Sequence, residues 1–182
     1  MIRIVIAEDQ EMLLGVIGSL LNLEEDMEVV GQARNGEGAI ALVHELKPDV
    51  CIMDVEMPIM SGLEAADALK LAGGCKVILL TTFARKGNFA RVLKSDVRGY
   101  LLKDDPSKEL IYTIRSIIDG ERIYSPELSE DGLNDNERGV DVLELLNDGQ
   151  FTNEASNHPL NKTRTVRSYF STIINKMKLP TG

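Results

Sequence analysis

The sequence predicts an α/β protein: a five-stranded, doubly wound parallel sheet followed by a small all-helical domain. Over residues 1–120, short apolar runs alternate with amphipathic stretches, and parallel strands need such helical crossovers between them. The length of 182 residues suits one ordinary domain and a smaller one. The two parts also differ in charge, because the chain is acidic up to residue 154 and basic after it.

The first half of the sheet is predicted from residues 2–50. Residues 2–7 are apolar and β-branched, which favours a buried strand. Residues 11–23 carry apolar side chains at helical spacing. Residues 28–32 predict the second strand, and a turn signal at Asn35 follows. The next helix, residues 37–46, is closed by Pro48.

The second half repeats this alternation three times. Residues 50–53 predict a strand and residues 63–72 a helix, and residues 76–80 and 88–95 predict the next such pair. The last pair is a strand at residues 99–102 and a helix at residues 107–119, for which Ser107 is the expected N-cap.

Charge and hydropathy exclude several classes of protein. The chain has 20 Lys and Arg against 29 Asp and Glu, yet residues 155–182 hold five basic residues and no acidic ones. A basic end on an acidic protein indicates contact with a polyanion, although a solvated basic helix end would show the same pattern.

No apolar run reaches the roughly 18 residues that span a bilayer. The first residues turn acidic at Glu8 and do not resemble a signal peptide. Cys51 and Cys75 make no disulfide or metal framework. We therefore expect a cytoplasmic protein without direct membrane contact.

Five polar side chains follow the predicted strands. They are Glu8, Asp9, Asp54, Thr81 and Lys103. In doubly wound folds the ligand site lies outside the carboxyl ends of the strands. Gathered carboxylates repel one another unless a cation lies among them, so the three acids predict an oxygen-ligand site for Mg²⁺. The lysine and threonine suit a phosphoryl group, and Asp54 suits a nucleophile toward phosphorus. Each residue alone could be an ordinary capping or loop residue.

The stretches around these residues resemble the receiver domain of two-component response regulators, which has a flavodoxin-like fold. The stretches are residues 6–10, 49–58, 79–82 and 99–103. The resemblance implies that Asp54 accepts a phosphoryl group from a sensor histidine kinase. It also implies that Mg²⁺ is held by Glu8, Asp9, Asp54 and the main-chain carbonyl of Glu56.

The same resemblance implies a switch, in which Thr81 moves toward the phosphoryl group and Tyr100 changes its packing. The output surface would be formed by residues 88–95, 99–102 and 107–119. The protein would not be an enzyme beyond the Mg²⁺-dependent phosphorylation and dephosphorylation of its own Asp54.

The remaining residues predict a connection and a second domain. Residues 121–133 are acidic, contain Pro126 and Gly132 and lack sustained periodicity, so we expect a linker between a receiver at residues 1–120 and a domain at residues 134–182. Residues 142–149 and 165–176 resemble the helix-turn-helix of NarL/FixJ (LuxR-type) regulators, and the receiver resembles those of DesR-like regulators. The DNA contacts implied are Lys162, Arg164, Thr165, Val166 and Arg167.

This second domain is divergent and truncated relative to that family. Residues 135–139 keep only Arg138 of the usual Leu-Thr-x-Arg-Glu opening, and Pro159 falls within the scaffold helix. The family's final helix, used in dimerisation, would lie beyond Gly182. Three functions follow as hypotheses. The first is a transcription factor that dimerises on promoter DNA when phosphorylated. The second is a phospho-switch that acts by protein–protein contact with a non-functional DNA-binding module. The third and weakest is a Mg²⁺-dependent hydrolase, for which Glu56 is the sole candidate acid–base group.

Overall fold

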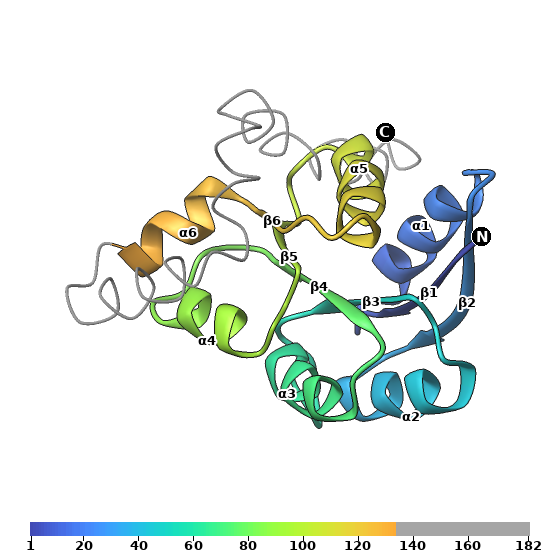
Figure 1. Ribbon diagram of the computed structural model, residues 1–182, viewed down its shortest axis with the longest axis horizontal. Helices are drawn as coiled ribbons and strands as arrows, with labels where there is room; N and C mark the ends of the chain where they lie inside the picture. Colours follow the sequence, from blue (N-terminus) through green and yellow to red (C-terminus); the bar gives the residue numbers. More distant parts are fainter. Residues whose placement is uncertain (134–182) are drawn as a thin grey trace.

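A computed structural model describes residues 1–133, which form one six-stranded parallel sheet with helices on both faces (Figure 1). The sheet order is β2-β1-β3-β4-β5-β6, and every neighbouring pair is parallel. The strands are β1 (Ile2–Ala7), β2 (Met27–Ala33), β3 (Val50–Asp54), β4 (Lys76–Thr81), β5 (Gly99–Leu102) and β6 (Ile123–Tyr124). The chain runs outward from β1 to β2 and returns to β3 on the other side. In doubly wound folds, ligands bind at such a reversal, outside the carboxyl ends of the two strands, which here are β1 and β3.

Six helices flank the sheet. They are α1 (Glu11–Asn22), α2 (Gly36–Leu46), α3 (Gly62–Ala72), α4 (Asn88–Lys94), α5 (Ser107–Ile118) and α6 (Pro126–Leu133). Helices α1 and α5 cover one face, α2, α3 and α4 cover the other, and α6 lies against α4 (Figure 1). Each residue of β3 is buried, because helices cover both faces of that strand. This explains why its sequence is apolar without alternation.

The expected α/β fold is confirmed, and each of the five predicted strands lies within one residue of its predicted bounds. The sheet differs from the expectation in having a sixth strand. The sequence predicts a linker at residues 121–133, whereas in the structure these residues form β6 and α6. The amide of Ile123 donates to the carbonyl of Arg98 at 2.9 Å, and the amide of Ser125 donates to that of Tyr100 at 2.8 Å. A strand of two residues is too short to show periodicity, and here the backbone of β5 supplies the pairing that stabilises it.

The N-terminal caps of α2 and α5 compare differently with the local sequence signals. Asn35 caps α2 through a bond from the Gly38 amide at 2.8 Å. Ser107 is not the N-cap of α5. It is the first helical residue, and the cap position is held by Pro106 without a side-chain bond. The extended backbone of Pro106, with φ −66° and ψ 146°, provides the turn into the helix.

The domain at residues 134–182 lies outside the described residues, so its boundary stays a prediction. Among residues 1–133, no helix combines the length and apolar character needed to cross a membrane.

Candidate functional site

The carboxyl ends of β1, β3 and β5 bring three predicted site residues into direct contact. The Lys103 ammonium lies 2.6 Å from Glu8 Oε1 and 2.8 Å from Asp54 Oδ2. All three side chains are buried, with relative exposures of 6% for Lys103, 1% for Glu8 and 7% for Asp54. Sequence positions 8, 54 and 103 therefore meet in one small, largely water-excluded cluster.

Asp9 joins this cluster as a third carboxylate. One oxygen each from Glu8, Asp9 and Asp54 lies within 4.8 Å of the others. Burial is the main cause that raises the pKa of Glu8 to about 7, and the charge of Asp54 adds to it, while the bond from Lys103 opposes it. Burial also lowers the pKa of Lys103, but its bonds to Asp54 and Glu8 outweigh this, so the net shift is upward. Lys103 therefore stays charged.

The charge balance of this cluster suits a divalent cation. Three carboxylates surround a single ammonium, so acidic groups outnumber basic ones, and hard oxygen ligands are those that Mg²⁺ prefers. Glu56 contributes its backbone nearby, since its amide donates to Asp54 Oδ1 at 3.3 Å. Its carbonyl as a further metal ligand stays a prediction.

Backbone packing fixes where Asp54 lies. The amide of Val55 donates to the carbonyl of Leu80 at 2.9 Å, so the chain continues in register with β4 past the end of β3. The amide of Gly62 returns to the carbonyl of Val55 at 2.9 Å. A Cβ on Gly62 would lie 2.3 Å from the carbonyl oxygen of Asp54, which no side chain could tolerate. This glycine lets α3 start directly against the candidate acceptor.

The two predicted switch residues lie on the adjacent strands. Thr81 ends β4, is 4% exposed, and donates its hydroxyl to the carbonyl of Phe83 at 3.1 Å. Tyr100 on β5 is fully buried and lies in register with Leu79 on β4 and Tyr124 on β6. Thr81 thus lies on the strand between β3 and β5, and Tyr100 lies on β5 itself, while their movement on phosphorylation stays a prediction.

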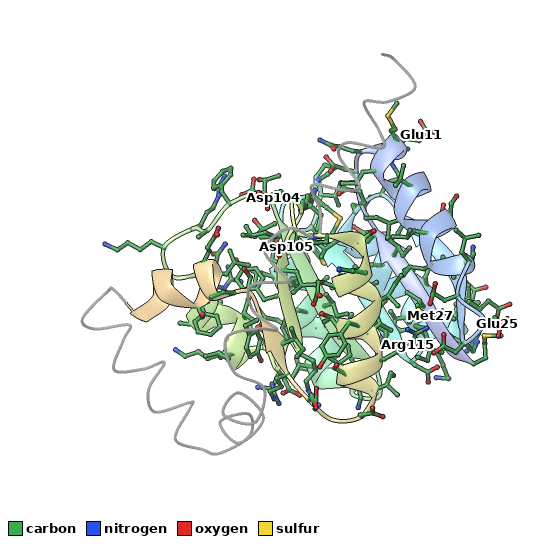
Figure 2. All side chains as sticks on the ribbon, turned by 90° about the horizontal axis from the view of Figure 1, so that it is seen from above. Glu11, Glu25, Met27, Asp104, Asp105 and Arg115 are labelled. Atoms are coloured by element: carbon green, nitrogen blue, oxygen red, sulfur yellow. The ribbon has the colours of Figure 1, made fainter. Side chains whose placement is uncertain are left out.

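Asp105 is a residue that sequence analysis missed. It is fully buried, its Oδ2 accepts from the Leu102 amide at 3.1 Å, and its own amide donates to the Leu102 carbonyl at 3.2 Å. These two bonds close the turn that presents Lys103. Burial raises the pKa of Asp105 to about 8. Figure 2 shows Asp104 and Asp105 at the edge of the sheet where α1 begins at Glu11, with Arg115 toward the opposite edge.

Two arginines, which no sequence pattern indicated, also contact residues of the site. The Arg34 guanidinium donates to the carbonyl of Asp9 at 2.8 and 3.2 Å. Arg85 pairs with Glu56 at 2.8 Å and lies 5.1 Å above the Phe83 ring. Both arginines come from loops whose approach to the site depends on the folded chain. The five predicted DNA-contacting residues, 162 and 164–167, lie outside the described residues.

Comparison with known proteins defines the class. The family model of the response regulator receiver domain matches residues 4–115. The chain belongs to this response regulator family.

Individual relatives narrow the class further. The transcriptional regulatory protein DesR of Bacillus subtilis is 54% identical over 183 residues, covering 98% of this chain and 92% of DesR. An uncharacterized transcriptional regulatory protein of that organism, YvfU, is 49% identical, covering 97% of this chain and 91% of YvfU. These matches confirm the expected resemblance to NarL/FixJ-type regulators with a DesR-like receiver.

Solved structures agree with the fold. A LuxR-family DNA-binding response regulator from Staphylococcus aureus is 39% identical with a TM-score of 0.62, covering 64% of this chain and 98% of that one. The response regulator domain of Thermotoga maritima CheB is 27% identical with a TM-score of 0.61, covering 65% of this chain and 96% of the other.

Proposed function

We propose that this response regulator controls transcription and is switched by phosphorylation of Asp54. The observation that carries the proposal is the buried contact of Lys103 with both Glu8 and Asp54, beside the carboxylate of Asp9. This arrangement offers a nucleophilic carboxylate, a fixed positive charge and a set of oxygen ligands at one point.

The phosphoryl group passes from the histidine of the kinase to Asp54 by an in-line displacement at phosphorus. A carboxylate oxygen of Asp54 attacks the phosphorus of a phosphohistidine, a P–O bond forms and the P–N bond breaks. The electron pair of that bond stays on the departing imidazole, which takes up a proton. Lys103, already 2.8 Å from Asp54 Oδ2, stabilises the negative oxygens of the incoming group. Glu8, Asp9, Asp54 and the carbonyl of Glu56 would hold Mg²⁺, which offsets the charge repulsion between the carboxylate and phosphoryl group.

The family supports the partners in this proposal. Response regulators take their phosphoryl group from a sensor histidine kinase, and DesR and YvfU are both named as transcriptional regulatory proteins. We infer that the phosphorylated chain forms a homodimer that binds promoter DNA through residues 134–182. Its chemistry is limited to gain and loss of its own phosphoryl group.

Labelling of Asp54 tests the acceptor. Incubation with acetyl phosphate and Mg²⁺ should add one phosphoryl group to the full chain, measured by intact mass. Asp54→Asn should abolish the addition, because the amide is not a competent nucleophile. Asp104→Asn is the matched control, since Asp104 is an exposed carboxylate at the same edge, and should label normally. Labelling that survives Asp54→Asn would show that another carboxylate is the acceptor.

Gel-shift titration of phosphorylated full chain tests the output. Affinity for promoter fragments should fall steeply with salt, and Arg167→Ala should weaken binding far more than Lys178→Ala. Absence of binding at low salt would favour the alternative, a phospho-switch that acts by protein–protein contact.

A further inference from the structure

Residues 121–133, here called the β6–α6 extension, cover part of the surface formed by β5 and α4. Strand β6 pairs with the outer edge of β5, with Ile123 opposite Gly99 and Tyr124 opposite Tyr100. Leu128 of α6 is 1% exposed and belongs to the core on the α4 side of the sheet. The extension therefore occupies an edge that an unpaired strand would offer to a partner.

Tyr124 is the residue through which the extension contacts both α4 and β5. Its ring contacts Phe89 edge-on, with centroids 5.4 Å apart and planes at 76°. Phe89 lies in the first turn of α4. The Tyr124 hydroxyl donates to the carbonyl of Val97 at 2.8 Å, just before β5. The backbone of Tyr124 pairs with Tyr100, the predicted switch residue.

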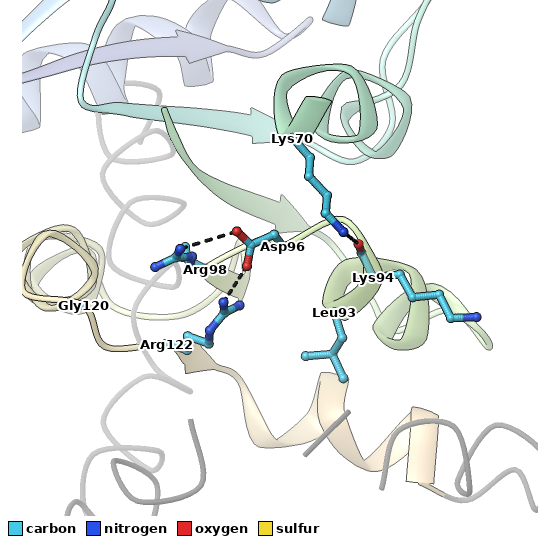
Figure 3. Close-up of a pocket in the computed structure, with 7 residues that line it drawn as sticks. All are labelled: Lys70, Leu93, Lys94, Asp96, Arg98, Gly120 and Arg122. Carbon is cyan, nitrogen blue, oxygen red and sulfur yellow. Dashed lines mark hydrogen bonds and ion pairs between the residues drawn. The ribbon is translucent and has the colours of Figure 1, made fainter. Parts of the chain in front are cut away.

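A second attachment lies at the amino edge of the sheet. Asp96 accepts a bond from Arg122 at 2.5 Å and pairs with Arg98 at 3.4 Å (Figure 3). The Arg122 side chain is only 7% exposed, whereas the Asp96 side chain is 40% exposed, so water reaches the carboxylate end of this contact. A cavity of about 730 Å³ adjoins these residues, with Lys70 reaching the carbonyl of Lys94 on its far side (Figure 3).

Helix α4 is a short element that supports the extension. It has seven residues, and its N-cap is Gly87 at φ 87° without a side-chain bond. Such short, uncapped helices depend on tertiary contacts for their stability. The loop before α4 is fixed in part by the bond from the Thr81 hydroxyl to the Phe83 carbonyl. A change at Thr81 therefore reaches the first turn of α4 within a few residues.

We propose that phosphorylation of Asp54 loosens the β6–α6 extension through the path Thr81, Phe89 and Tyr124; this rests on the proposed function. When the Thr81 hydroxyl turns to a phosphoryl oxygen, the Phe83 carbonyl loses its donor. The first turn of α4 loosens and Phe89 withdraws from the Tyr124 ring. Strand β6 then keeps its pairing with β5 but loses its contact with α4. That pairing opens more readily, so the outer edge of β5 becomes available, and the chain leading into residue 134 is released from the receiver.

Amide hydrogen exchange on the full chain tests this inference. Four amides report on the extension: those of Ile123, Ser125, Leu128 and Ser129, which donate to Arg98, Tyr100, Ser125 and Ser125, respectively. Acetyl phosphate and Mg²⁺ should speed their exchange by about tenfold, a typical size for coupling between two sites. Asp54→Asn given the same treatment should show no change. Intact mass from the same samples records the phosphoryl group.

The outcomes separate the two proposals. An added phosphoryl mass with unchanged exchange at these amides overturns the extension proposal alone. Absence of the mass overturns the proposed function and this inference with it.

Thermodynamic linkage supplies a second test, in which amide exchange is measured in the unphosphorylated protein. If phosphorylation loosens the extension, loosening it first must favour phosphorylation by the same factor. Tyr124→Leu removes the edge contact and the bond to Val97 but keeps an apolar side chain. It should raise exchange at Ser125 without phosphate and raise the phosphorylated fraction at equilibrium several-fold. Asp96→Asn should act in the same direction. Asp26→Asn, which removes an Arg-paired carboxylate on the opposite side of the molecule, should leave both measurements unchanged. Unaltered phosphorylation in Tyr124→Leu with faster exchange at Ser125 would refute the coupling.

Discussion

The two edges of the sheet carry ion clusters of opposite design. At the carboxyl edge, one ammonium, Lys103, lies between the carboxylates of Glu8 and Asp54, and all three side chains are less than 10% exposed. At the amino edge, one carboxylate, Asp96, lies between the guanidiniums of Arg98 and Arg122, and its side chain is 40% exposed. The first cluster has an excess of negative charge in a shielded place, and the second has an excess of positive charge near water.

This difference distinguishes the carboxyl-edge cluster, which we propose to react, from the amino-edge cluster, which joins two segments of the chain. Buried charges interact strongly, so an unbalanced buried cluster responds to any cation or phosphoryl group that enters it. Exposed charges are screened, so an unbalanced exposed cluster costs little and its bonds mainly hold two chain segments together. The following substitutions test that contrast, from the largest expected effect to the smallest.

Lys103→Met should have the largest effect. Removing a preorganised charge from the reacting oxygens typically slows a reaction by about 100-fold or more. We expect that loss in the rate of Asp54 labelling by acetyl phosphate, measured by intact mass over time. Lys108→Met is the control, because Lys108 is an exposed lysine at the start of α5. A loss of less than about threefold in Lys103→Met would contradict the assigned role of the buried ammonium.

Asp105→Asn should have an intermediate, pH-dependent effect. Burial raises the pKa of Asp105 to about 8 from 3.8, with the charges of Asp104, Glu127 and Glu109 adding to it. The folded chain therefore binds a proton that the unfolded chain has already released, and stability falls as the pH rises from about 4 to about 8. The neutral amide avoids this loss and keeps an oxygen for the Leu102 amide.

Thermal unfolding of parent and variant checks this expectation. The gain of Asp105→Asn over the parent should be larger at about pH 8 than at about pH 5, by at least about 1 kcal/mol, since each pKa unit corresponds to about 1.4 kcal/mol. Comparison with the parent at each pH cancels the contribution of Glu8. A gain that does not depend on pH would show that Asp105 is ionised throughout this range. Asp119→Asn serves as the reference, because Asp119 is an exposed carboxylate at the end of α5.

Arg98→Gln should have the smallest effect. Its pair with Asp96 is 3.4 Å long and partly exposed, and Asp96 keeps its shorter bond to Arg122. We expect a loss of no more than about 1 kcal/mol in the free energy of unfolding by urea, and an even smaller loss in high salt. A loss of several kcal/mol would mean that the amino-edge cluster is as strongly coupled as the carboxyl-edge one.

Sequence reasoning located the site because of a property of parallel sheets. The carboxyl ends of parallel strands meet at one edge, so the residues that end or follow β1, β3 and β5 had to approach one another. The same reasoning did not find the direct bond from Lys103 to Glu8, since periodicity carries no information on side-chain contacts between strands. It also missed the burial of Asp105, because the acidic residues that follow Lys103 are typical of an ordinary exposed turn.

The sequence by itself determined the order of strands and helices, the five polar residues at the strand ends and the family to which the chain belongs. These follow from local properties: apolar period, turn residues and short motifs. Only the tertiary structure decided that residues 121–133 pack on β5 and α4 as a strand and helix. Their stability comes from a strand edge and an aromatic ring contributed by distant residues, and no local pattern records such a partner.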